Sequence, residues 1–202
     1  LDSAWKSDSA GAIIPFEELS PRWKVLRING ISPLDKPMDL KNYPLSIKYS
    51  LVGTKSENLS SGELAKKILA VLPSTNRDEE KMTVLMMSGT TALTRTTAFK
   101  INLHGVDYPI EEIKNWFLQA DLRHISNEVS FYKDCPDPDP YTSSLRFCSD
   151  EKYLQTLKDL GVNVIELTGN HLNDYGAEAL ASTIDIYKEA GMNYFGGGLD
   201  IT

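Results

Sequence analysis

Several features that identify common protein classes are missing from this sequence. Its 202 residues contain no run of about 18 apolar residues, so the sequence predicts no membrane-spanning helix. The net charge is −7, and Lys and Arg are scattered rather than grouped into a basic stripe. This pattern argues against nucleic acid and anionic lipid as partners. An acidic protein that handles a phosphate or a polyanion needs a local cationic site, which a bound metal can supply.

Cysteine is also scarce, because the chain contains only Cys135 and Cys148. The absence of a Cys-x-x-Cys pair argues against a thiolate zinc site. The two cysteines flank a loop rich in Pro, Asp and Ser. If they are paired, they close this loop in an oxidising compartment and stabilise the fold by about 3 kcal/mol. If they are free, Cys148 is a small buried hydrophobe at the end of a strand. We favour the pair, because the twelve loop-like residues between them bring the ends together easily.

The first 72 residues have the pattern of a small α+β segment. Apolar or alternating stretches predict strands at 11–19, 22–30 and 43–53, and we expect Trp23 to lie in a core. Apolar residues at helical spacing predict a helix over 60–72. A polar stretch that begins with Pro73 then indicates a linker over 73–80.

From residue 81 onward, predicted strands and helices alternate. This order argues for an α/β fold with a mostly parallel sheet and right-handed crossovers. Within it, we expect Trp116 and His124 to be packed structural residues, and His104 to lie in a solvated turn. The predicted strands are 81–89, 121–126, 162–169 and 192–198, and the predicted helices are 109–120, 149–161 and 173–191.

Polar residues follow three of these predicted strands. Thr90 and Thr91 follow the first, Asn127 and Glu128 the second, and the sequence Thr-Gly-Asn-His-Leu-Asn-Asp at 168–174 the third. Ligands of open α/β sheets bind beyond the carboxyl ends of the strands. We therefore expect the three strand tips to converge at one edge of the sheet.

The triplet Gly169-Asn170-His171 has two interpretations. As a site, its asparagine offers an amide oxygen to a divalent metal, and its histidine serves as a proton donor or a metal ligand. As a turn, Asn170 caps the next helix and His171 is packed or solvated. The triplet alone does not favour one over the other.

Three separated motifs resemble the capsule-synthesis CapA family. They are LTGNHLNDYG at 167–176, the pair Ala120-Asp121 followed by Asn127-Glu128, and GMNYFGGG at 191–198, in the same order and spacing as in that family. CapA proteins are related to calcineurin-like metallophosphoesterases, which have two stacked sheets and a metal centre at the strand tips. The resemblance covers 81–202 and implies the N-terminal part of such a layered domain, incomplete in this chain.

The resemblance also implies roles for individual residues. Asn127, Glu128 and Asn170 would bind a divalent metal of the manganese or zinc class. His171 would be catalytic, and Asp174 would hold His171 or cap the following helix.

Two further positions are candidates for substrate binding. Thr90 stands where the family has a metal-binding aspartate, and a hydroxyl is a far poorer ligand than a carboxylate. The departure puts the binuclear site in doubt. Arg95 follows the first strand tip and can bind a phosphate or carboxylate with two hydrogen bonds, although a solvated loop arginine is the simpler interpretation.

Residues 1–72 resemble the closing part of a periplasmic solute-binding-protein-like lobe, which precedes the capsule domain in some bacterial CapA-like proteins. Together the resemblances imply a protein on the extracellular face of the bacterial cell envelope. Any membrane attachment would be peripheral, through a segment outside this chain.

Three functions are consistent with these expectations. The first is synthesis, release or anchoring of an anionic polymer such as poly-γ-glutamate, by metal-assisted hydrolysis or transfer if it is catalytic. The second is a non-catalytic binding module whose metal site has degenerated, which Thr90 favours. The third is a phosphoesterase that acts on a small phosphate-containing substrate.

Overall fold

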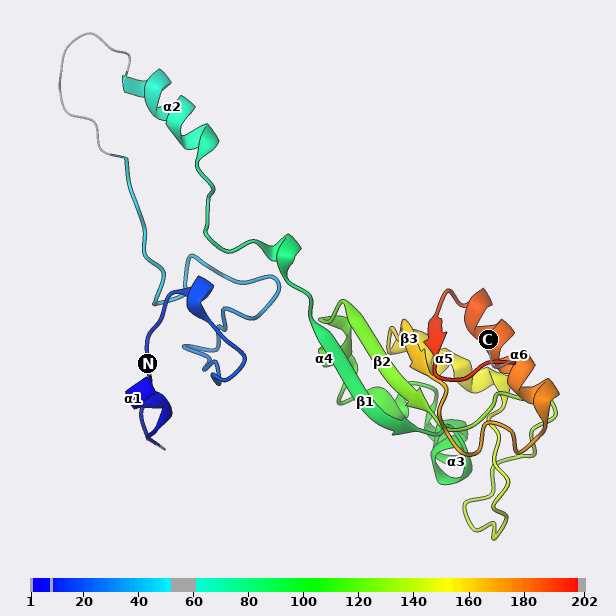
Figure 1. The fold of residues 1–202 in the computed structure, drawn as a ribbon. Coiled ribbons are helices and arrows are strands. Elements are labelled where there is room, and N and C mark those ends of the chain that lie inside the picture. Colours follow the sequence, from blue (N-terminus) through cyan, green and yellow to red (C-terminus); the bar gives the residue numbers. More distant parts are fainter. Residues whose placement is uncertain (1, 8, 52–60, 200–202) are drawn as a thin grey trace. The chain divides into compact units, whose positions relative to one another are not determined.

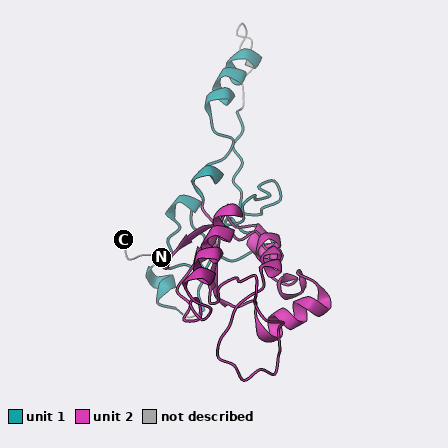
Figure 2. Ribbon diagram, turned by 90° about the vertical axis from the view of Figure 1, so that its right-hand side faces the viewer, with its two compact units in different colours: residues 1–82 teal, residues 83–202 magenta. Residues whose placement is uncertain are grey.

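A computed structural model describes residues 2–7, 9–51 and 61–199. The chain divides into two compact units, Leu1–Met82 and Thr83–Thr202, which are coloured separately in Figure 2. In the described ranges, no helix is long and apolar enough to cross a membrane.

Unit 1 contains helices but no β-strand among its described residues. Its elements are α1 (Asp2–Trp5), η1 (Phe16–Glu18), α2 (Ser61–Val71) and η2 (Glu79–Lys81). Helix α2 confirms the helix predicted over 60–72. Among the residues of unit 1 that the structure describes, the strand-like pairing is limited to an isolated bridge between Ile28 and Ile31.

The strands predicted at 11–19, 22–30 and 43–53 are therefore wrong as far as the described residues go; residues 52 and 53 lie outside them. Their apolar side chains find no partner surface, because Ile47 is 77% exposed and Tyr49 is 92% exposed. A strand needs neighbouring strands and a buried face to be stable. Trp23 is only half-buried, so the core that was predicted around it does not form.

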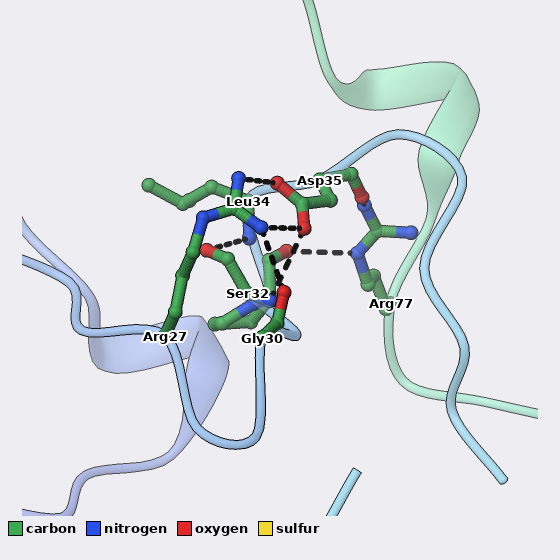
Figure 3. A network of polar contacts seen from close by, with 7 residues as sticks. Arg27, Gly30, Ser32, Leu34, Asp35 and Arg77 are labelled. Atoms are coloured by element: carbon green, nitrogen blue, oxygen red, sulfur yellow. Dashed lines mark hydrogen bonds and ion pairs between the residues drawn. The ribbon is translucent and has the colours of Figure 1, made fainter. Parts of the chain in front are cut away.

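Unit 1 is held by a polar network rather than by an apolar core (Figure 3). The buried Arg77 side chain donates Nε to the Pro33 carbonyl oxygen at 3.0 Å, and it also bonds the Asp35 carbonyl and the Glu79 carboxylate. Arg27 forms two hydrogen bonds of 2.6 Å with the Asp35 carboxylate. Together the two arginines fix the turn around residues 27–35.

Unit 2 is an α/β domain, as predicted. Its four parallel strands are β1 (Leu85–Thr91), β2 (Leu122–Asn127), β3 (Val164–Glu166) and β4 (Asn193–Phe195), in the order β1-β2-β3-β4. Each strand thus pairs with the next in sequence through a helical crossover (Figure 1).

The crossovers contain α3 (Arg95–His104), η3 (Tyr108–Ile110), α4 (Lys114–Leu118), η4 (Glu151–Tyr153), α5 (Leu154–Asp159) and α6 (Ala177–Glu189). Crossovers of one hand in a sequentially ordered sheet place their helices on the same face. The residues on that face are buried, with Ile125 1% and Ile165 0% exposed. On the opposite face, Met87 is 62% and Phe195 50% exposed.

Two helical segments differ from the prediction. The helix predicted over 109–120 is broken into η3 and α4, and Trp116, expected in the core, is 61% exposed. Helix α3 was missed altogether. Its Thr-rich start lowers helix propensity, and only Ala98 and Ile101 are buried, so its apolar stripe is narrow. His104 is its last residue and stacks on Tyr108 at 4.6 Å.

Candidate functional site

The strand tips meet at the carboxyl edge of the sheet. The Glu128 amide donates to the Thr91 carbonyl at 3.0 Å, and Val129 pairs with His171 in a parallel bridge. Gly169 makes the closest approach, because a Cβ at this position would lie 2.3 Å from Glu128 Cα. Only glycine fits this contact without a backbone shift.

His171 and Asp174 form a hydrogen-bonded pair at this edge. His171 Nδ1 lies 2.7 Å from Asp174 Oδ2, and the two side chains are 19% and 18% exposed. Asp174 Oδ2 also accepts a hydrogen bond of 2.8 Å from the Phe147 amide. Helix α6 begins at Ala177 after Gly176, without a side-chain cap. The structure thus places Asp174 against the imidazole and not at the helix end.

The environment of Asp174 favours its ionised form. Burial alone would raise the pKa of this carboxyl, but hydrogen bonds from the Phe147 amide and from His171, with the charges of His171 and Arg146, lower the pKa below its usual value. An ionised carboxylate on Nδ1 leaves Nε2 of His171 as the nitrogen that can exchange a proton with a substrate.

A disulfide loop (residues 135–148) forms the other side of the site. Cys135 and Cys148 are bonded, which agrees with the pairing that we favoured. The Phe147 ring meets the His171 ring edge-on at 4.5 Å between centroids. Arg146 donates Nη2 and Nε to the Asp174 carbonyl at 2.8 and 3.1 Å. Sequence reasoning missed Phe147 and Arg146, because these contacts join residues 24 to 28 positions apart and no local motif marks them.

An open pocket of about 480 Å³ lies beside this loop. Its lining residues are Ala92, Thr94, Arg95, Thr96, Thr97, Glu128 and Phe147. The simpler interpretation of Arg95 was a solvated arginine in a loop. Arg95 is instead the first residue of α3, but it is exposed, as that interpretation expected. Its guanidinium lies 5.5 Å from the Phe147 ring centroid, and its Nη2 donates to the Thr142 carbonyl at 3.2 Å. The pocket therefore combines a cation, three hydroxyls, a carboxylate and an aromatic ring.

The remaining predicted site residues do not all face this pocket. Thr90 is exposed and lines a neighbouring cavity of about 250 Å³. Asn127 is 2% exposed and donates Nδ2 to the Val129 carbonyl at 2.7 Å, so its amide is engaged in the interior. Asn170 is exposed at the strand tip.

The described residues do not fit a complete metal site. No group of three or more His, Cys, Asp and Glu side chains is placed to hold an ion within these ranges. Because the Asn127 amide faces the interior, only Glu128 and Asn170 remain of the three residues that were predicted to bind the metal.

His124 lies on the opposite face of the sheet from the helices. It is 5% exposed, and neither ring nitrogen has a hydrogen-bond partner among the described residues. Nε2 lies 3.5 Å from the Glu166 carboxylate. The histidine is thus buried, as expected of a structural residue, but its polar atoms are not satisfied by hydrogen bonds.

Comparison with known proteins gives two matches. The family described as "Bacterial capsule synthesis protein PGA_cap" matches residues 84–202. The "Capsule biosynthesis protein CapA" of Bacillus anthracis is 28% identical over 132 residues, which is 64% of this chain and 31% of that relative. The chain thus spans about a third of the length of this curated relative.

Proposed function

The chain belongs to the bacterial capsule synthesis family PGA_cap, and from this membership we propose that its strand-tip pocket binds an anionic capsule polymer, poly-γ-glutamate. Binding would serve synthesis, release or anchoring of the polymer on the extracellular face of the cell envelope. The disulfide supports this location, because disulfides persist in oxidising compartments.

The observation that carries the proposal is the Arg95 pocket next to the His171–Asp174 pair. A guanidinium recognises a carboxylate with charge-assisted hydrogen bonds, and the surrounding threonine hydroxyls add neutral donors. The chain as a whole is acidic, so a polyanion needs such a local cation to overcome the general repulsion. The Phe147 ring supplies an apolar wall for the methylene groups of a glutamyl unit.

In a hydrolytic version of this function, His171 acts as a general acid. Water would attack the scissile centre as the bond to the leaving nitrogen or oxygen breaks, and His171 Nε2 would donate a proton to that leaving atom. Asp174 would stabilise the imidazolium through Nδ1. Arg95 would hold the substrate carboxylate. The binding of a divalent metal of the manganese or zinc class is a separate proposal.

A non-catalytic binding module is the second candidate. Two observations favour it: Thr90 stands where the resemblance implies a metal-binding aspartate, and the Asn127 amide faces the interior. This module would bind polymer with no dependence on a metal and no turnover.

The binding proposal is tested with purified poly-γ-glutamate and the Arg95→Gln variant. We expect the variant to bind about tenfold more weakly, since it loses one charge-assisted contact worth about 1.4 kcal/mol. Binding by the native chain should also weaken as salt is raised. Lys158→Gln removes the same charge from an exposed position on α5 and serves as the control. Equal affinities of the Arg95→Gln variant and the native chain would contradict the proposal.

A second experiment separates the catalytic and binding versions. Metal content is measured by elemental analysis after manganese and zinc loading, in the native chain and in Asn170→Ala, and products of polymer or phosphodiester cleavage are assayed beside it. Stoichiometric metal that falls in the variant, with turnover that His171→Ala abolishes, supports catalysis. Release of small phosphate products alone would point to a phosphoesterase. Polymer binding without turnover supports the binding module.

A further inference from the structure

The base of the disulfide loop is fixed to the core of unit 2. The Tyr132 amide donates to the Ser149 carbonyl at 2.8 Å, and the Ser149 amide donates to the Ser130 carbonyl at 2.9 Å. Ser149 Oγ donates to the Leu93 carbonyl at 2.7 Å. Cys148 is itself buried, at 4% exposed. The residues just before Cys148 therefore leave the core from an anchored point.

Those residues hold Asp174 from two sides. The Phe147 amide donates to Asp174 Oδ2 at 2.8 Å, the same oxygen that lies 2.7 Å from His171 Nδ1. Arg146 donates twice to the Asp174 backbone carbonyl and places its guanidinium 4.8 Å from the Tyr175 ring centroid. The loop thus fixes both the backbone and the carboxylate of Asp174.

The same loop also contacts the cation of the pocket. The Phe147 ring contacts both His171 and Arg95: its centroid lies 4.5 Å from the imidazole centroid and 5.5 Å from the guanidinium carbon. Thr142 accepts a hydrogen bond from Arg95. One short loop therefore touches Arg95, His171 and Asp174, three of the groups that the proposed function uses.

We propose that the disulfide loop is a positioning element, in which Arg146 and Phe147 orient the His171–Asp174 pair and Arg95, and that the Cys135–Cys148 bond keeps this arm in place. No helix or strand lies between the two cysteines, and the disulfide is the covalent bond that closes the loop. Without that bond, the arm is ordered only by non-covalent contacts, such as those of Arg146 and Phe147 with the half-buried Asp174, and it gains conformational freedom. The role of the loop in ligand binding rests on the proposed function. The effect of the loop on the position of the His171 imidazole does not.

Reduction tests the covalent part of this proposal. A dithiol reductant such as dithiothreitol transfers two electrons and two protons to the Cys135–Cys148 bond, giving two thiols, and is itself oxidised to a cyclic disulfide. Thiol counting confirms complete reduction. In the oxidised, 15N-labelled chain of 202 residues, we expect a downfield imidazole N–H resonance from the bond between His171 Nδ1 and Asp174. Its loss in Asp174→Asn assigns it.

The resonance should broaden or disappear in the reduced chain and in Arg146→Gln, which keeps the disulfide. Leu145→Ala is the matched control, because this neighbouring side chain is 77% exposed, and it should leave the resonance unchanged. Backbone amide spectra show in each sample that the sheet is still folded. An unchanged resonance in both the reduced chain and Arg146→Gln would overturn the proposal.

Polymer binding is measured on the same samples. We expect reduction to weaken poly-γ-glutamate binding about tenfold. No binding by the oxidised native chain would reject the proposed function, while the imidazole resonance would still decide whether the loop positions the pair. Equal binding by oxidised and reduced chains, with the resonance lost on reduction, would reject the link between the loop and the ligand.

Discussion

One carboxylate oxygen of Asp174 accepts hydrogen bonds from both His171 and the Phe147 amide, and its pKa is lowered as a result. A lowered pKa in the folded state means that ionised Asp174 stabilises the fold above the ordinary carboxyl pKa of about 3.9. That stability is lost as pH falls from this value through the lower, folded-state pKa. The Asp174→Asn variant cannot titrate, so it should lose this part of the acid sensitivity.

We expect Asp174→Asn to cost about 1 kcal/mol at neutral pH, because it weakens charge-assisted hydrogen bonds. The difference from the native chain should shrink as pH falls below 4. Denaturant unfolding between pH 2.5 and 7 (about the range in which carboxyls titrate) measures it. Asp185→Asn on the exposed side of α6 is the control. Parallel stability curves for the native chain and Asp174→Asn would contradict the prediction.

At the scale of single residues, the contacts of a residue could be predicted from the sequence when its neighbours in the chain determine its position. His171 and Asp174 are three residues apart in one turn, and the family resemblance implied either their contact or a helix cap at Asp174; the structure shows the contact. Phe147 and Arg146 reach the same turn from a loop that is distant in sequence, and their own neighbours give no sign of it. Asn127 occupies the expected strand tip, but the direction of its side chain depends on the Val129 carbonyl.

At the scale of elements, a wide apolar face made most strands and helices of unit 2 predictable, whereas α3, which buries only Ala98 and Ile101, was missed. Helix α2 was predicted from its spacing of apolar residues, although its described residues include no buried one. β2 and α6 have buried residues at strand or helix spacing, such as Ile125 and Tyr187. Residues 43–51 show the alternation of a strand, yet no partner strand lies beside them among the described residues. Pattern alone does not supply the hydrogen-bonding partner that a strand requires.

The contact between two strand tips gives a prediction at this scale. A methyl group on Gly169 would lie 2.3 Å from Glu128 Cα, so Gly169→Ala must push the second and third tips apart. We expect it to destabilise unit 2 by about 1–3 kcal/mol and to weaken polymer binding at the Glu128 side of the pocket. Gly89→Ala is the control, since no atom lies within 4 Å of its Cβ. Thermal unfolding compares the two, and equal melting temperatures would count against the close approach.

At the scale of the whole molecule, the two units differ in what holds them together. The match to the PGA_cap family begins at residue 84, next to the boundary of unit 2 at Thr83. Unit 2 has a continuous apolar core of residues such as Ile165, Leu157 and Phe117. Among the described residues of unit 1, by contrast, the buried ones are the polar Ser32 and Arg77. The resemblance of residues 1–72 to a solute-binding lobe stays a prediction.

This difference predicts that the units lose order separately. Arg77→Ala leaves the Pro33 and Asp35 carbonyls without their donor, and unsatisfied polar groups of this kind cost about 1–3 kcal/mol. Exchange of the Ile28 and Ile31 amides, which bond across the adjacent turn, should accelerate by about 100-fold. Arg22→Ala removes an exposed ion pair with Asp2 and the guanidinium contacts with the Trp5 and Trp23 rings; it is the control and should change exchange of the Ile28 and Ile31 amides little. Hydrogen exchange resolved by residue measures both variants. Amides of the unit 2 sheet should keep their protection in Arg77→Ala, and equal acceleration there would mean that the two units unfold together.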